Sequence, residues 1–137
     1  MKHGNEEIGN IGTFYHMWWT CPKVKDFWEK IYNELKKVMK VTFSKKPEAF
    51  LLSMTNEEIP SQDRVFFMYA TTAARILLAR TWKGEEIPTV EEWQMKLMDY
   101  MELAELTARI RDQREEKVSQ DWKKYKDYLL KCVKLNI

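Results

Sequence analysis

The sequence predicts an all-α domain that is a bundle of four main helices. It also allows a short fifth helix after the first one. Apolar residues recur at helical spacing over long segments, and no segment alternates with the period of a strand. The four glycines and four prolines fall between the helical patterns. With 137 residues, 45% of them hydrophobic, the chain suits one domain with a buried core.

The first main helix is predicted from Pro22 to about Lys40. Proline is favoured in a first turn, because its missing N–H would have no partner there. One face of this segment is apolar at helical spacing: Val24, Phe27, Trp28, Ile31, Tyr32, Leu35, Val38 and Met39. Residues 41–60 are less regular. There "KPEAFLL" allows a short helix that begins at Pro47, and "TNEEIPS" indicates a loop.

The second main helix is predicted to begin at Ser61, which can act as its N-cap, and to reach about Trp82 before Gly84 stops it. Apolar residues occupy almost every face of this segment. A helix of this kind belongs in the middle of a bundle.

The third and fourth main helices follow polar start signals. In "PTVEEW", Thr89 as N-cap and Glu92 three residues later form a capping box, and the helix should continue to about Ile110. "RDQREEKVSQ" is either a loop or an exposed extension of that helix. A last amphipathic helix is predicted to open at Ser119.

The residues offer little material for catalysis. The chain has no glycine-rich phosphate loop and no nucleophile elbow, and its paired carboxylates lie at polar helix ends and in loops. We therefore expect no enzyme and no small-molecule substrate. No apolar run has signal-peptide or membrane-helix length, so we expect no membrane partner and an intracellular protein, cytoplasmic or nuclear, with two free thiols.

His16 and Cys21 are the candidate metal ligands. Imidazole and thiolate both bind zinc, and the gap of four residues between them suits a zinc knuckle. A structural zinc site needs four ligands, however, and two bind too weakly to organise a fold. The preferred interpretation is an unoccupied half-site whose residues cap or pack the helix start, so no cofactor is expected.

Charges are segregated along the chain, although the formal net charge is only +2. From Glu85 to Glu105 there are seven acids and one lysine. The basic residues form a lysine run without acids and continue on the second main helix, and a basic face of this kind can contact phosphates. A solvated helix surface is the simpler interpretation. The candidate nucleic-acid contacts are Lys36, Lys37, Lys40, Lys45, Lys46, Arg75 and Arg80.

Four short motifs occur in a specific order: "HMWWTC", "FWEKI", "ARTW" and "PTVEEW". In this order they resemble the extreme C-terminal part of vertebrate LINE-type (non-LTR) retrotransposon polyproteins, which are endonuclease–reverse transcriptases. The resemblance covers about residues 12–130. In that family the start belongs to a knuckle of the form Cys-x3-Cys-x7-His-x4-Cys. His16 and Cys21 match its last two ligands, whereas Gly4 and Ile8 stand where the first two cysteines would be. A small insertion near Asn10 would instead place those cysteines at or beyond Met1.

The resemblance implies a division into residues 1–21, a truncated knuckle-like segment, and residues 22–137, a helical domain. The family's catalytic parts lie upstream and nothing in this chain matches them. The resemblance therefore implies a non-catalytic segment that supports target-primed reverse transcription by binding RNA or the parent complex, or a truncated remnant of such a segment. RNA and the parent reverse-transcriptase domains are the partners that it implies.

The alternative is a helical protein-interaction module that docks a partner helix on an exposed methionine and tryptophan surface, without binding nucleic acid. The tryptophans themselves recur at helical spacing. This spacing indicates packing in a core more than stacking on bases.

Overall fold

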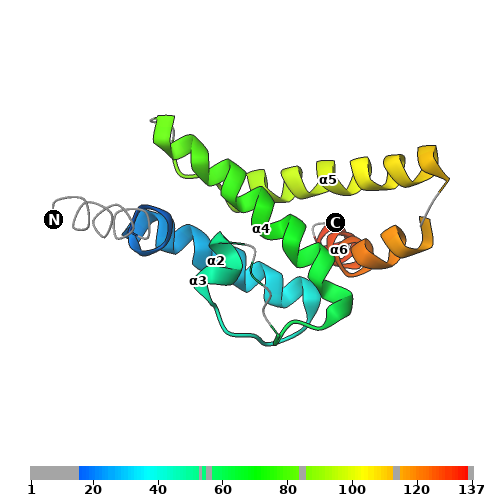
Figure 1. The fold of residues 1–137 in the computed structure, drawn as a ribbon, viewed down its shortest axis with the longest axis horizontal. Coiled ribbons are helices and arrows are strands. Elements are labelled where there is room, and N and C mark those ends of the chain that lie inside the picture. The colour runs from blue at the N-terminus through cyan, green and yellow to red at the C-terminus, as the bar shows by residue number, and fades with distance from the viewer. Residues whose placement is uncertain (1–15, 53, 55–56, 84–85, 113–114, 136–137) are drawn as a thin grey trace, which may run out of the picture.

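The computed structural model describes residues 16–52, 54, 57–83, 86–112 and 115–135. Figure 1 shows how they are arranged. Over these residues the chain forms helices and no strand, which confirms the predicted all-α class. None of the described helices combines the length and the apolar composition needed to cross a bilayer.

Four of the helices are long, as predicted, and the short fifth helix after the first is present. In chain order the elements are η1 (His16–Thr20), α2 (Pro22–Met39), α3 (Pro47–Leu51), η2 (Ser61–Asp63), α4 (Arg64–Leu78), η3 (Ala79–Lys83), α5 (Val90–Arg111) and α6 (Glu115–Leu135).

Helix α4 lies in the middle of the bundle, as its apolar residues predict. It packs against α2, α3, α5 and α6 and crosses the centre of the molecule in Figure 1. Its consecutive residues Phe66 and Phe67 point about 100° apart around the helix axis. Phe67 joins an aromatic cluster with α3 and the segment before it, whereas Phe66 packs on aromatic rings of α6. Only Met68 and Ile76, each 47% exposed, leave large apolar groups of α4 open to solvent.

The tryptophans described with their side chains belong to the core, as their spacing predicts. Trp28, Trp93 and Trp122 are buried, and Trp18 and Trp19 are half-buried against the same core. Buried indole N–H groups need acceptors. Trp28 donates to the carbonyl of Trp18 at 2.6 Å, and Trp93 donates to the carbonyl of Ala70 at 2.9 Å. These bonds tie η1 to α2 and α5 to α4.

Two predicted helix starts are wrong. Ser61 is not the N-cap of α4: it is the first residue of the 3-10 turn η2, which leads directly into α4, and the N-cap position of α4 is Asp63. Helix α6 begins at Glu115 and not at Ser119. Asp112 has φ 52° and ends α5 in the left-handed region. The acids Glu115 and Glu116 then occupy the first turn of α6, where the helix dipole favours negative charge.

Lys124 joins three elements at one end of the bundle. Its ammonium lies 3.1 Å from a carboxylate oxygen of Asp63, which is only 4% exposed, and it donates to the carbonyl of Met39 at 2.9 Å. Met39 is the last residue of α2, and the last carbonyls of a helix have no partner within it. One side chain of α6 therefore holds the end of α2 and the start of α4.

Candidate nucleic-acid interface

Of the predicted metal pair, the structure describes one side chain. The side chain of His16 lies outside the described residues, as does His3. Cys21 is a free, half-buried thiol between η1 and α2, and it packs against the core without capping α2. Within the described residues, no three histidine, cysteine or acidic side chains come together as metal ligands could.

The lysine run from 36 to 46 divides into separate groups in the structure. Lys36 and Lys45 lie over the ring of Tyr32, with their ammonium nitrogens 4.4 Å and 5.8 Å from its centroid. Lys45 also forms an ion pair with Glu29. Lys45 therefore helps to hold the 41–46 segment on α2 and is partly neutralised, whereas the contact of Lys36 with Tyr32 lies within α2.

Lys46 lies near the acidic side chain of Glu58. The backbone N–H and the hydroxyl of Ser44 lower the pKa of the Glu58 carboxyl, and the charge of Lys46 lowers it further by a smaller amount. Glu58 therefore offsets part of the positive charge of Lys46.

Arg75 points into the bundle. Its guanidinium donates to the carbonyl of Phe50 and to the hydroxyl of Thr72, both at 2.9 Å. Phe50 lies in the last turn of α3, so Arg75 satisfies a carbonyl that this short helix cannot pair itself. Burial lowers the pKa of Arg75. The guanidinium of Arg75 is therefore engaged in contacts within the fold.

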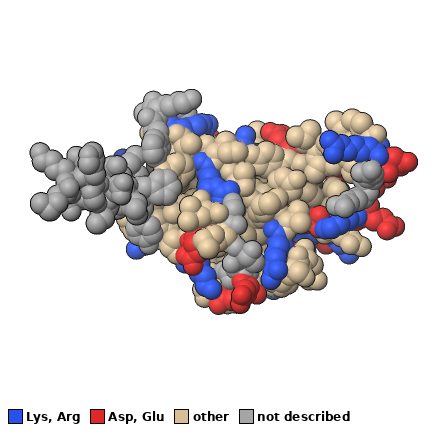
Figure 2. Space-filling model, viewed as in Figure 1, with Lys and Arg blue, Asp and Glu red and all other residues tan. Residues whose placement is uncertain are grey.

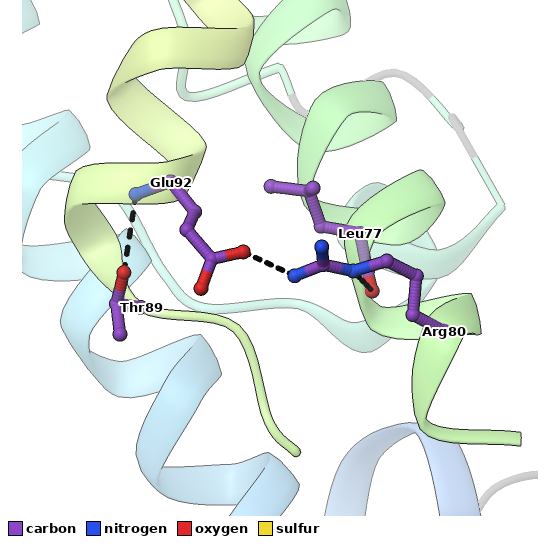
Figure 3. A network of polar contacts seen from close by, with 4 residues as sticks. All are labelled: Leu77, Arg80, Thr89 and Glu92. Carbon is purple, nitrogen blue, oxygen red and sulfur yellow. Dashed lines mark hydrogen bonds and ion pairs between the residues drawn. The ribbon is translucent and has the colours of Figure 1, made fainter. Parts of the chain in front are cut away.

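Arg80 is paired as well (Figure 3). The guanidinium of Arg80, in η3, forms an ion pair with the carboxylate of Glu92 and donates to the carbonyl of Leu77 at 3.4 Å. The hydrogen bond from Arg80 lowers the pKa of Glu92. The backbone N–H of Glu92 donates to the hydroxyl of Thr89 at 3.1 Å, which confirms Thr89 as the N-cap of α5. Arg80 therefore links η3 to α5.

Lys37 and Lys40 meet further lysines where the end of α2 lies beside α6. Together with α6 they line a pocket of about 120 Å³. Its charged and polar lining consists of Lys37, Lys40, Lys124, Lys131, Asp127 and Tyr128. We call these four lysines the α2–α6 basic surface. It brings together residues that are about 90 positions apart in the sequence.

Acidic groups offset only part of this charge. Lys37 is 3.5 Å from a carboxylate oxygen of Glu34 but is 64% exposed, so this pair contributes little. Lys124 is held by Asp63. Lys40 and Lys131 are both exposed. Asp127 lines the same pocket, so three carboxylates lie close to the four lysines. The remaining positive charge belongs mainly to the exposed Lys40 and Lys131, and these side chains can contact a phosphate or another anion.

The seven predicted contacts therefore separate into different groups. Figure 2 shows Lys and Arg as separate blue groups on the viewed face, with no continuous basic patch. Sequence reasoning found Lys37 and Lys40 but missed Lys124 and Lys131. Their spacing of seven residues places these two on one side of α6, and this spacing was the available signal. It could not show that this side meets the end of α2.

No protein-family model matches the chain, and no solved structure matches it.

Proposed function

We propose that this chain is a non-catalytic, RNA-binding helical segment of a LINE-type reverse transcriptase, and that it holds RNA phosphates on the α2–α6 basic surface. The observation that carries the proposal is the convergence of four lysines from two distant segments on one small pocket. The order of the short motifs supports the LINE-type origin. In the parent reaction the segment supports target-primed reverse transcription by retaining the RNA, and the upstream domains perform the chemistry.

The geometry suits phosphate contacts that do not read sequence. An ammonium group is a compact point charge with three donors, and it binds a phosphate oxygen without requiring one particular base. Lys124 is fixed by Met39 and Asp63, while Lys40 and Lys131 are exposed and can adjust to the RNA backbone. The proposed binding is therefore electrostatic and should weaken as salt rises.

The proposal is tested by filter binding to a structured RNA across a salt series. The variant Lys40→Glu/Lys131→Glu should lose about tenfold in affinity at 0.1 M salt, because two phosphate contacts become repulsive. The plot of log affinity against log salt should become shallower by about one unit for each lysine removed.

The matched control is Lys23→Glu/Lys25→Glu, which makes the same change in net charge on the first turn of α2, where both lysines are exposed. This control should keep nearly all of the affinity. An equal loss in both variants would mean that RNA responds to net charge alone. Affinity that does not fall with salt would exclude phosphate contacts altogether.

A further inference from the structure

We propose that the outward face of α5 docks an amphipathic helix with basic flanks, supplied by a partner protein. The face is defined by four exposed apolar side chains: Met95 (67% exposed), Leu103 (61%), Leu106 (49%) and Ile110 (74%). It shares no residue with the α2–α6 basic surface, so the inference stands apart from RNA binding.

The four side chains form one stripe along α5. At about 100° per residue they fall within a sector of about 80°, and from Met95 to Ile110 they extend over about 22 Å. The opposite side of α5 is buried in the bundle through Trp93, Leu97, Met101 and Ala108. An ordinary surface helix is polar on its outward side, whereas α5 carries large apolar side chains on its outward side as well as on its buried side. Helix α5 forms the upper right edge of the molecule in Figure 1, and no described helix lies above that part of it in the view.

A groove beside the stripe provides a socket for a docked side chain. It is an open pocket of about 480 Å³ whose lining includes Leu103, Tyr69, Tyr100 and Val118. The rings of Tyr69 and Tyr100 are 5.8 Å apart and form part of its wall. Helix-in-groove recognition uses this combination of an apolar ridge and a neighbouring pocket.

The charges on this face select a basic partner. Glu91, Asp99 and Glu102 are exposed, and the ion pairs found among the described residues include none of them. One exposed base, Arg109, lies on the same side of the helix, at the C-terminal end of the stripe. The acids of α5 that do have partners are Glu92, with Arg80, and Glu105, with Lys126. The carboxylates of Glu91, Asp99 and Glu102 therefore flank or interrupt the apolar stripe, where lysine or arginine side chains of a docked helix would meet them.

The same acids disfavour a second copy of this chain as the occupant. Asp99 and Glu102 lie near the middle of the stripe. An antiparallel pair of α5 helices centred on the stripe would bring the two Glu102 carboxylates together at the twofold axis. A parallel pair would place each acid opposite its own copy. Like charges at the centre of an interface are costly. A basic helix meets no such repulsion.

Two synthetic helices of about 18 residues provide the probes. Both carry the same leucine stripe, flanked by lysines in one and by glutamates in the other, and binding is measured by fluorescence anisotropy. We expect the lysine-flanked helix to bind the wild-type chain at least tenfold more tightly than the glutamate-flanked one.

The variant Leu106→Gln/Ile110→Gln should bind the lysine-flanked helix at least tenfold more weakly than the wild-type chain does. The control variant Leu52→Gln/Leu130→Gln, changed at exposed positions elsewhere, should bind it as the wild-type chain does.

A charge exchange completes the test. Asp99→Lys/Glu102→Lys should reverse the preference toward the glutamate-flanked helix, whereas Glu57→Lys/Glu86→Lys, at exposed loop positions, should not. Circular dichroism confirms that each variant is folded. The inference is overturned if neither helix binds or both bind equally, or if the control pairs have the same effects as the α5 pairs. It is also overturned if light scattering shows a dimer that Leu106→Gln/Ile110→Gln dissociates, because the occupant would then be a second copy.

Discussion

At the residue scale, Lys40 combines an unfavourable backbone conformation with a candidate functional position. It ends α2 with φ 58°, in the left-handed region, and its N–H donates to the carbonyl of Lys36 at 2.9 Å. Glycine is the usual residue at such a helix end, because it has no Cβ to clash there. A lysine at this position places a positive charge at the negative end of the helix dipole. Its side chain also forms one side of the α2–α6 basic surface.

The variant Lys40→Gly separates these two effects. Relief of the left-handed backbone should stabilise the fold by about 1 kcal/mol, and loss of the favourable charge at the helix end should cost about 0.5 kcal/mol. We therefore expect a net gain of about 0.5 kcal/mol in the free energy of unfolding, measured in urea, together with RNA affinity about threefold weaker at low salt.

Asp112→Gly is the matched control, because Asp112 has φ 52° at the end of α5. It should also gain stability, but without loss of RNA affinity. A loss of RNA affinity in both glycine variants would mean that the helix ends, and not the charge of Lys40, determine binding.

At the element scale, α6 is held to the rest of the bundle by aromatic packing and by the contacts of Lys124. Trp122 and Tyr125 are buried against Phe66, and the hydroxyl of Tyr125 donates to the carbonyl of Gln94 in α5 at 2.9 Å. Lys124 adds the contacts to Asp63 and to Met39. These contacts fix the position and the orientation of α6, and they therefore determine whether the lysines of α6 lie beside those of α2.

Removal of the Lys124 ammonium should therefore destabilise the fold. Lys124→Met leaves the carboxylate of Asp63, 4% exposed, without its cation, and we expect a loss of about 2 kcal/mol in the free energy of unfolding. The neighbouring Lys123 is exposed, so Lys123→Met should change it by less than about 0.5 kcal/mol. Equal values for the two variants, measured by urea unfolding, would show that the Lys124 contacts contribute nothing.

Local signals predicted the elements better than they predicted the site. Pro22 and the apolar stripe placed α2 within one residue of its end, and Thr89 placed the start of α5. The start of α6 was missed because "EEKV" carries no capping residue, only the acids that favour a first turn.

The sequence predicted only part of the candidate site. Within the basic surface, Lys37 and Lys40 were predicted from an uninterrupted run of lysines. Lys124 and Lys131 were not, because only the packing of α6 brings them beside α2. Arg75 and Arg80 proved to have partners within the fold that no sequence pattern shows.

At the scale of the whole molecule, the charges are distributed so that the ends and faces of the bundle differ. The α2–α6 basic surface lies at the end of α2, and the exposed acids Glu91, Asp99 and Glu102 lie on the outward face of α5, although the formal net charge is only +2. A chain of this kind attracts polyanions through one region while its overall charge stays small. The account depends on that region being where RNA is held.

Chemical acetylation of lysines, with and without a structured RNA and read by mass spectrometry, tests this directly. The account predicts that RNA protects Lys37, Lys40 and Lys131, while Lys23, Lys30 and Lys117, on other parts of the surface, keep their reactivity. Protection spread evenly over all six lysines, or protection of Lys23 and Lys30 alone, would contradict it.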